Sequence, residues 1–205
     1  APIGKDVILL KKQSDFSRLM GYAGRYRVFT YASWVLSAIS ALSALVPFLY
    51  IWRILRDVLA AAPDYTQAVN IPHYGWMAVL FAVLSYLIYV CALLCSHLSA
   101  FRVATKLRLA VTKHLAELPL GFTERFGSGQ LRKIIQESTG AAETYLAHQL
   151  PDQAGAMATP AGLLVLLFAF DWRLGLLSLV PVALGFLIMM TMTGQRMQEK
   201  MKEYQ

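Results

Sequence analysis

The sequence predicts an all-α integral membrane protein whose long transmembrane helices extend beyond the bilayer into the cytoplasm. Of its 205 residues, 57% are hydrophobic and only 15% are charged, and the mean hydropathy is +0.50. Soluble domains carry about 25% charged residues. Four runs contain no charged residue at all, at 28–52, 65–101, 153–170 and 174–195. Each reaches the roughly 18–20 residues that a helix needs to cross the hydrocarbon, and none shows the polar stripe of a soluble helix.

The lysines and arginines predict the orientation of the spans, which we place at about 28–52, 74–101, 150–170 and 174–195. Four spans put both ends of the chain on one side of the membrane. Sixteen of the 19 lysines and arginines lie in the two ends and the middle segment, which by the positive-inside rule are cytoplasmic. We therefore expect a multi-pass protein of the plasma (inner) membrane. The net charge of +7 then reflects topology and attraction to anionic lipid headgroups in the bilayer, not a nucleic-acid partner.

Residues 1–27 are expected to form a cytoplasmic N-terminus with an amphipathic helix that lies along the membrane surface. Between Asp15 and Arg27, apolar residues share one side of a helix, with Arg18 and Arg25 opposite. The apolar residues are Phe16, Leu19, Met20, Ala23 and Tyr26. The alternative is a frayed, solvated tail, because Gly21 and Gly24 lower helix propensity.

The first span carries small residues at helical spacing, namely Ser33, Ser37, Ser40 and Ala44. Small residues of this kind mark close helix packing in membranes, and a polar lining for a substrate is the alternative. Pro47, Pro160 and Pro181 lie inside spans, where neighbouring helices tolerate the kinks that these prolines cause. We expect residues 53–73 to form an external loop.

Residues 102–149 predict a cytoplasmic helical hairpin. Apolar residues continue at helical spacing beyond the second span, so one helix is expected from Tyr74 to Leu118, about 65 Å long. Pro119 and Gly121 stop it, and a second helical run from about Leu131 leads back to the third span. Residues 119–131 are then the far tip of the hairpin, with a short transverse helix between the two long ones. Asp171, Trp172 and Arg173 alone join the third and fourth spans, which makes these an antiparallel pair.

The glycines of the tip do not form a nucleotide site. Five residues separate Gly121 from Gly127, where a phosphate-binding loop has four, and Ser128 stands where such a loop has lysine. Cys91 and Cys95 share a helical face, but no third ligand falls on it, so packing is favoured over a metal or redox site. We identify no catalytic, cofactor-binding or metal-binding residue in this chain.

These features resemble one family, the transmembrane domain of type IV ABC exporters. The stretch "LPLGFTERFGSGQL" has the order of the family's coupling helix at Leu118, Pro119, Phe122, Glu124, Arg125, Gly129 and Leu131. Trp172, Arg173 and Leu174 match the family's tight turn, and the N-terminal amphipathic stretch is similar to its elbow helix. The chain departs from the family at Lys133, Ile134, Glu137 and Ser138.

The resemblance implies that residues 28–205 are part of such a domain, with four of its six spans. It implies a half-transporter that pairs with a second half, as homo- or heterodimer, and with a nucleotide-binding domain that uses ATP and Mg²⁺. The missing spans and that domain are expected beyond Gln205 or on another chain. The tip would dock on the nucleotide-binding domain, with Phe122 and Phe126 as apolar anchors. Its other contact residues would be Glu124, Arg125, Gly127, Gly129, Gln130 and Leu131.

The function implied is ATP-driven transport of an amphipathic or small-molecule substrate by alternating access. No ATPase motif lies in this chain, so ATP hydrolysis belongs to the full protein. A stand-alone four-span adaptor or assembly subunit without ATP coupling is the alternative. An intramembrane enzyme is disfavoured, because the interiors of the spans contain no acidic residue.

Overall fold

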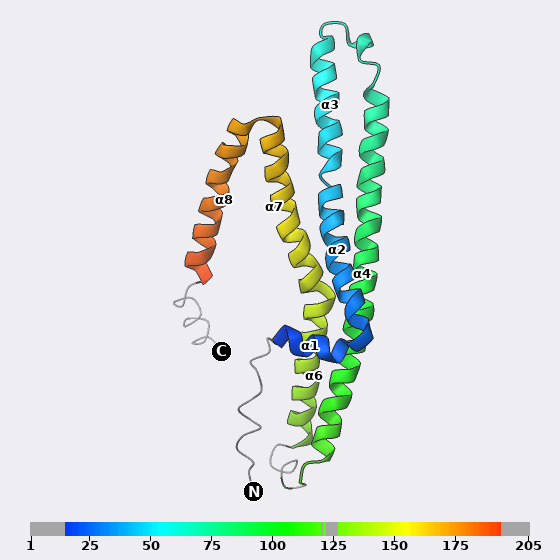
Figure 1. Cartoon of the computed structure of the whole chain (residues 1–205), viewed down its shortest axis with the longest axis vertical. Coiled ribbons are helices and arrows are strands. Elements are labelled where there is room, and N and C mark those ends of the chain that lie inside the picture. Colours follow the sequence, from blue (N-terminus) through cyan, green and yellow to red (C-terminus); the bar gives the residue numbers. More distant parts are fainter. Residues whose placement is uncertain (1–14, 120, 122–126, 194–205) are drawn as a thin grey trace. The chain divides into compact units, whose positions relative to one another are not determined.

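The protein is a set of long helices joined by short connections (Figure 1). The computed structural model describes residues 15–119, 121 and 127–193, and within these residues there is no strand. Four helical segments are long and apolar enough to cross a membrane: Phe16–Ala61, Ile71–Ala116, Ser128–Phe170 and Trp172–Thr191. Residues up to Ala158 and residues from Thr159 onward pack as two separate units.

The first segment is interrupted by a short break. It contains α1 (Asp15–Ala23), the 3₁₀ turn η1 (Gly24–Tyr26), α2 (Arg27–Ser43) and α3 (Val46–Ala61). Pro47 lies in the first turn of α3, where its missing N–H group is not needed for a helical hydrogen bond. Pro47 therefore begins a new helix, and does not kink a continuous one as expected from the sequence.

The predicted external loop 53–73 is wrong in extent, because α3 continues to Ala61. Arg53 and Arg56 lie within this helix, and each guanidinium lies near an aromatic ring of α3, 5.7 Å from the ring centre of Tyr50 and 5.2 Å from that of Trp52. The first charged residue, Arg53, therefore marks the end of the charge-free run and not the end of α3. The connection is residues 62–70, which include the 3₁₀ turn η2 (Tyr65–Gln67).

In this connection, the Asp64 carboxylate accepts hydrogen bonds from Thr66 and Gln67. Its donors are the Thr66 hydroxyl at 2.6 Å, the Thr66 N–H at 3.2 Å and the Gln67 amide at 3.2 Å. These bonds favour the charged form and hold the pKa of Asp64 below its usual value.

The remaining helices are long. α4 runs from Ile71 to Ala116, and its 46 residues make it about 69 Å long. α6 (Ser128–Thr144) continues through the π-helical turn η3 (Tyr145–Gln149) into α7 (Leu150–Phe170), and α8 (Trp172–Thr193) follows.

The turn between α7 and α8 is shorter than predicted, because Trp172 and Arg173 already belong to α8. Asp171 alone lies outside the two helices, and its carboxylate accepts a hydrogen bond from the Arg173 N–H at 2.8 Å. A side chain at Gly175 would come within 2.6 Å of the Phe168 ring, so the close pairing after this turn requires glycine.

In the first unit, α4 packs against α2, α3 and α6 (Figure 1). The serines of α2 lie in this packing, as predicted: Ser33, Ser37 and Ser40 are buried. Ser40 donates to the carbonyl of Ser85 at 2.8 Å and Ser37 to that of Pro151 at 2.7 Å. The prediction fails for Ala44, which is exposed and lies in the break between α2 and α3.

Serine hydroxyls of α4 also form hydrogen bonds with neighbouring helical segments. Ser96 is fully buried and donates to the carbonyl of Ala147 at 2.8 Å. Ala147 belongs to the π-helical turn η3, so this bond joins α4 to η3. Ser99 shares a hydrogen bond of 2.6 Å with Thr30. Within the described residues, no buried side-chain polar atom lacks a partner.

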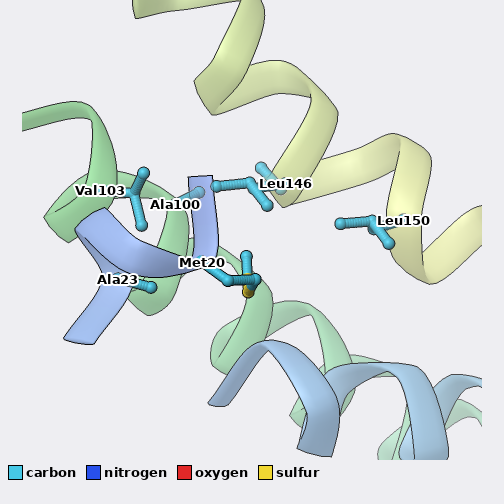
Figure 2. Packing of buried hydrophobic residues seen from close by; sticks show 7 residues of the cluster. Met20, Ala23, Ala100, Val103, Leu146 and Leu150 are labelled. Carbon is cyan, nitrogen blue, oxygen red and sulfur yellow. The ribbon is translucent and has the colours of Figure 1, made fainter. Parts of the chain in front are cut away.

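The predicted amphipathic helix forms as α1, and its apolar side is covered by protein. Met20 and Ala23 are buried against Ala100 and Val103 of α4 and against Leu146, Ala147 and Leu150 (Figure 2). Phe16 and Leu19 pack at the edge of this cluster. α1 is therefore fixed across α4 and η3.

We expect Ser96→Ala to destabilise the protein by about 1–2 kcal/mol, because it removes a buried hydrogen bond between α4 and η3. The apparent melting temperature of the purified full-length protein should fall by several degrees. The matched control is Ser178→Ala, whose hydroxyl donates to the Gly175 carbonyl of its own helix. Equal melting temperatures for the two variants would contradict the role given to Ser96.

Candidate functional site

The candidate site lies at the end of the hairpin formed by α4 and α6 (Figure 1). α4 ends at Ala116, where the N–H of Glu117 bonds to the carbonyls of Lys113 and His114, and Pro119 follows soon after. α6 begins at Ser128, directly after Gly127. The predicted coupling segment 119–131 therefore contains the connection and the first turn of α6.

The structure describes half of the predicted coupling residues. Gly127, Gly129, Gln130 and Leu131 lie at the start of α6, while the other four, and the short transverse helix expected there, fall outside the described residues. These four are Phe122, Glu124, Arg125 and Phe126.

Gly127 sets the direction in which α6 begins. Its φ of +72° lies in a region that favours glycine, and its carbonyl accepts the first helical hydrogen bond from the Leu131 N–H at 3.2 Å. Gly129 has open space where a side chain would stand, so its backbone does not require glycine. Gln130 is exposed and Leu131 is half-buried.

A groove of about 1040 Å³ runs between the two helices at this end. Arg108 and Thr112 of α4 line one side, and Leu131 and Ile135 give the α6 side an apolar surface. Gly127, Ser128, Arg132 and Gln136 complete the lining. Among the coupling residues that the structure describes, Gly127 and Leu131 thus reach this groove.

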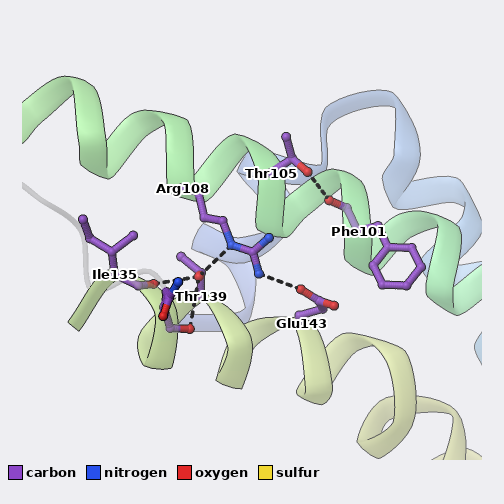
Figure 3. Close-up of polar contacts among 7 residues, drawn as sticks. Phe101, Thr105, Arg108, Ile135, Thr139 and Glu143 are labelled. Atoms are coloured by element: carbon purple, nitrogen blue, oxygen red, sulfur yellow. Dashed lines mark hydrogen bonds and ion pairs between the residues drawn. The ribbon is translucent and has the colours of Figure 1, made fainter. Parts of the chain in front are cut away.

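Arg108 links the two helices at the base of the groove (Figure 3). Its Nε donates to the Thr139 hydroxyl at 3.1 Å, and its Nη2 lies 3.0 Å from the Glu143 carboxylate. Thr139 is 1% exposed and donates in turn to the carbonyl of Ile135 at 2.7 Å. One guanidinium thereby fixes the register of α4 against α6.

The sequence reasoning missed this link. Thr139 and Glu143 stand four residues apart and so share a helical face, and this spacing can be recognised in the sequence. The arginine that faces them is 31 residues away from Thr139 and cannot be chosen without the register of the two helices.

Two long helices are held side by side and together carry a short connecting segment. In residues 15–119, 121 and 127–193, no three histidine, cysteine or acidic side chains gather as metal ligands. Cys91 and Cys95 are unbonded thiols, the first exposed and the second half-buried.

Comparison with known proteins identifies relatives over most of the chain. The family described as ABC transporter transmembrane region matches residues 30–205. The mycobactin import ATP-binding/permease proteins IrtA of Mycolicibacterium smegmatis and Mycobacterium tuberculosis are 33% and 32% identical to it, each over 80% of this chain. The ATP-dependent lipid A-core flippase of Idiomarina loihiensis is 34% identical over 83% of this chain. The chain spans 18% of the length of each IrtA protein and 29% of the flippase.

We expect Arg108→Ala to loosen the hairpin locally. Loss of the bonds to Thr139 and Glu143 should cost about 1 kcal/mol, because the arginine is partly exposed and water competes with it. Amide hydrogen exchange over 128–144 in the full-length protein should become about fivefold faster.

Lys133→Ala is the control for Arg108→Ala, because it removes only the exposed pair with Glu137, which lies within α6. Lys133→Ala should change the amide hydrogen-exchange rate over 128–144 by about twofold or less. Equal acceleration in both variants would show that Arg108 does not hold the two helices together.

Proposed function

The chain belongs to the ABC transporter transmembrane family, and we propose that it serves an ATP-driven transporter as the part of the membrane domain that receives motion from a nucleotide-binding domain. The transporter would move an amphipathic or small-molecule substrate by alternating access. The chain is a multi-pass membrane protein segment, with four helical segments of spanning length.

The observation that carries the proposal is the projection of α4 beyond its charge-free run. The run ends at Phe101, and the helix continues without interruption to Ala116, about 20 Å further. α6 accompanies it and is linked to it through Arg108. A pair of linked helices of this length can carry a displacement from its tip to the membrane as a nearly rigid body.

We propose that the segment 119–131 docks on the nucleotide-binding domain. Phe122 and Phe126 would be the apolar anchors, and Glu124, Arg125 and Gln130 the polar contacts. Leu131 supports this assignment, because it brings an apolar side chain to the groove beside the segment. Gly127 would set the angle at which the segment leaves α6.

The proposed transporter lies in the plasma (inner) membrane, with the hairpin and both ends of this segment in the cytoplasm. The bias in lysine and arginine supports this orientation. ATP and Mg²⁺ would be bound by the nucleotide-binding domain, and a second half-transporter would complete the substrate pathway.

The relatives support a substrate of amphipathic or small-molecule class. Two carry names for mycobactin import and one is named as a lipid A-core flippase, so the shared feature in these names is transport of a discrete molecule by a protein that uses ATP. The same names favour a transporter over the stand-alone adaptor.

We expect the double variant Phe122→Ala and Phe126→Ala to uncouple the full-length transporter. Truncation of two anchors at an interface typically costs several kcal/mol, so ATP-dependent transport in proteoliposomes should fall by at least about tenfold. ATP hydrolysis should become insensitive to substrate, because the membrane domain no longer communicates with the ATPase domain.

Tyr65→Ala is the control for this double variant. It removes an exposed aromatic side chain from η2, in the connection at the opposite end of α4 from the coupling segment. Transport by this variant should be close to normal. Normal transport by a folded, membrane-inserted Phe122→Ala and Phe126→Ala variant would refute the proposed docking role.

A further inference from the structure

We propose that Arg102 and Lys106 of α4, together with the η1 turn, form a binding site for the phosphate of an anionic phospholipid headgroup. The site needs only the membrane position of α4 and the fold of the first unit. It does not depend on ATP coupling or on the identity of the transported substrate.

The two basic residues lie at the edge of the apolar part of α4. The charge-free run ends at Phe101, Arg102 is the next residue, and Lys106 follows one turn later, about 6 Å along the axis. The headgroup layer on each side of the hydrocarbon is about 5–8 Å thick. The charge-free part of α4, residues 71–101, is about 46 Å long, close to the roughly 40–45 Å of a bilayer with its headgroup layers, so both charges lie at the level of the lipid headgroups.

The η1 turn lies beside Arg102 and Lys106. Gly24 has φ +55°, and the Nζ of Lys106 lies 3.3 Å from the point where a Cβ of residue 24 would stand. Glycine therefore both permits the turn and leaves room for the ammonium group beside the backbone. The Arg102 guanidinium lies 5.4 Å from the ring centre of Tyr26, where a cation–π contact orients it.

The charges of the pair are not neutralised by the protein. Arg102 and Lys106 are four residues apart on one face of α4, where like charges repel. Both are exposed, and neither forms an ion pair with an acidic side chain in the part of the chain that the structure describes. Arg25, also exposed, belongs to η1 and adds to the positive potential. A phosphate anion between these groups would relieve the repulsion and accept charge-assisted hydrogen bonds.

The packing of the first unit holds the η1 turn in place. Ala23, which directly precedes η1, is completely buried in the cluster with Ala100 and Val103 of α4 (Figure 2). This packing fixes η1 beside Arg102 and Lys106, so binding does not have to order the turn. A free phosphate ester has the same charge chemistry as a lipid headgroup, but the membrane depth of the site favours the lipid.

The test is native mass spectrometry of the detergent-solubilised full-length protein titrated with dioleoylphosphatidylglycerol. Dioleoylphosphatidylcholine is titrated in parallel as the lipid without net charge. Arg102→Gln with Lys106→Gln should weaken phosphatidylglycerol binding by about 10- to 30-fold, because each basic residue near a lipid surface contributes several-fold to affinity. Phosphatidylcholine binding should change little.

The control is Lys113→Gln with Arg132→Gln, which removes the same charge at two exposed positions away from the site. Equal loss of phosphatidylglycerol in both double variants, unchanged binding in the first, or equal affinity of the wild type for both lipids would each overturn the proposal. Displacement of the lipid by excess sn-glycerol 1-phosphate would overturn the lipid assignment in favour of a soluble phosphate ester. If the first double variant does not fold, Lys106→Gln alone is tested, with an expected loss of about fivefold.

Discussion

The demand that backbone polar groups find partners where water is absent determines most of this structure. In a long helix the backbone N–H and C=O groups bond to each other within the same segment. The described segments of membrane-spanning length are helical throughout, apart from the short break before α3. Buried polar side chains must meet the same demand. Ser96 of α4 does so by donating to the carbonyl of Ala147 in η3, which makes a specific contact between two helical segments.

The same principle explains why α2 binds its neighbours through small hydroxyl residues. Lipid tails are as apolar as leucine, so leucine side chains give little preference for a helix over lipid. Ser37 and Ser40 are small enough for the backbones to approach, and their hydroxyls reach carbonyls of other helices. Trp34 adds a bond from its indole N–H to the carbonyl of Leu150 at 2.7 Å. These bonds determine which helix faces lie together, and the proposed motion of the hairpin would be carried through them.

The sequence was sufficient for the features that depend on local composition. The apolar runs predicted the helical segments of spanning length, and Pro119 and Gly121 predicted the end of α4 to within a few residues. The small residues at Ser33, Ser37 and Ser40 predicted the packed face of α2. The order of motifs around the hairpin tip and at Trp172 predicted the family, which the match over residues 30–205 confirms.

The sequence was insufficient where the outcome depends on register or on a helix end without a local signal. Arg53 and Arg56 end the apolar run but not α3, because arginine is a good helix former in water as well. Arg108 pairs with α6 only in one relative register of two helices, which no spacing within either helix reveals. The role of the coupling segment rests on resemblance, since Phe122 and Phe126 lie outside the described residues.

The five residues of η3 also have a consequence for evolution of the chain. A π-turn holds one residue more than the α-helical turn it replaces, and each residue rotates a helix by about 100°. Loss of one residue between Thr144 and Leu150 would therefore leave an ordinary α-helical turn, whereas gain of one residue would turn α7 relative to α6 by this angle and direct the carbonyls bound by Trp34 and Ser37 elsewhere. We expect relatives that keep these contacts to lack insertions here, while point substitutions and a one-residue deletion within η3 are tolerated more readily.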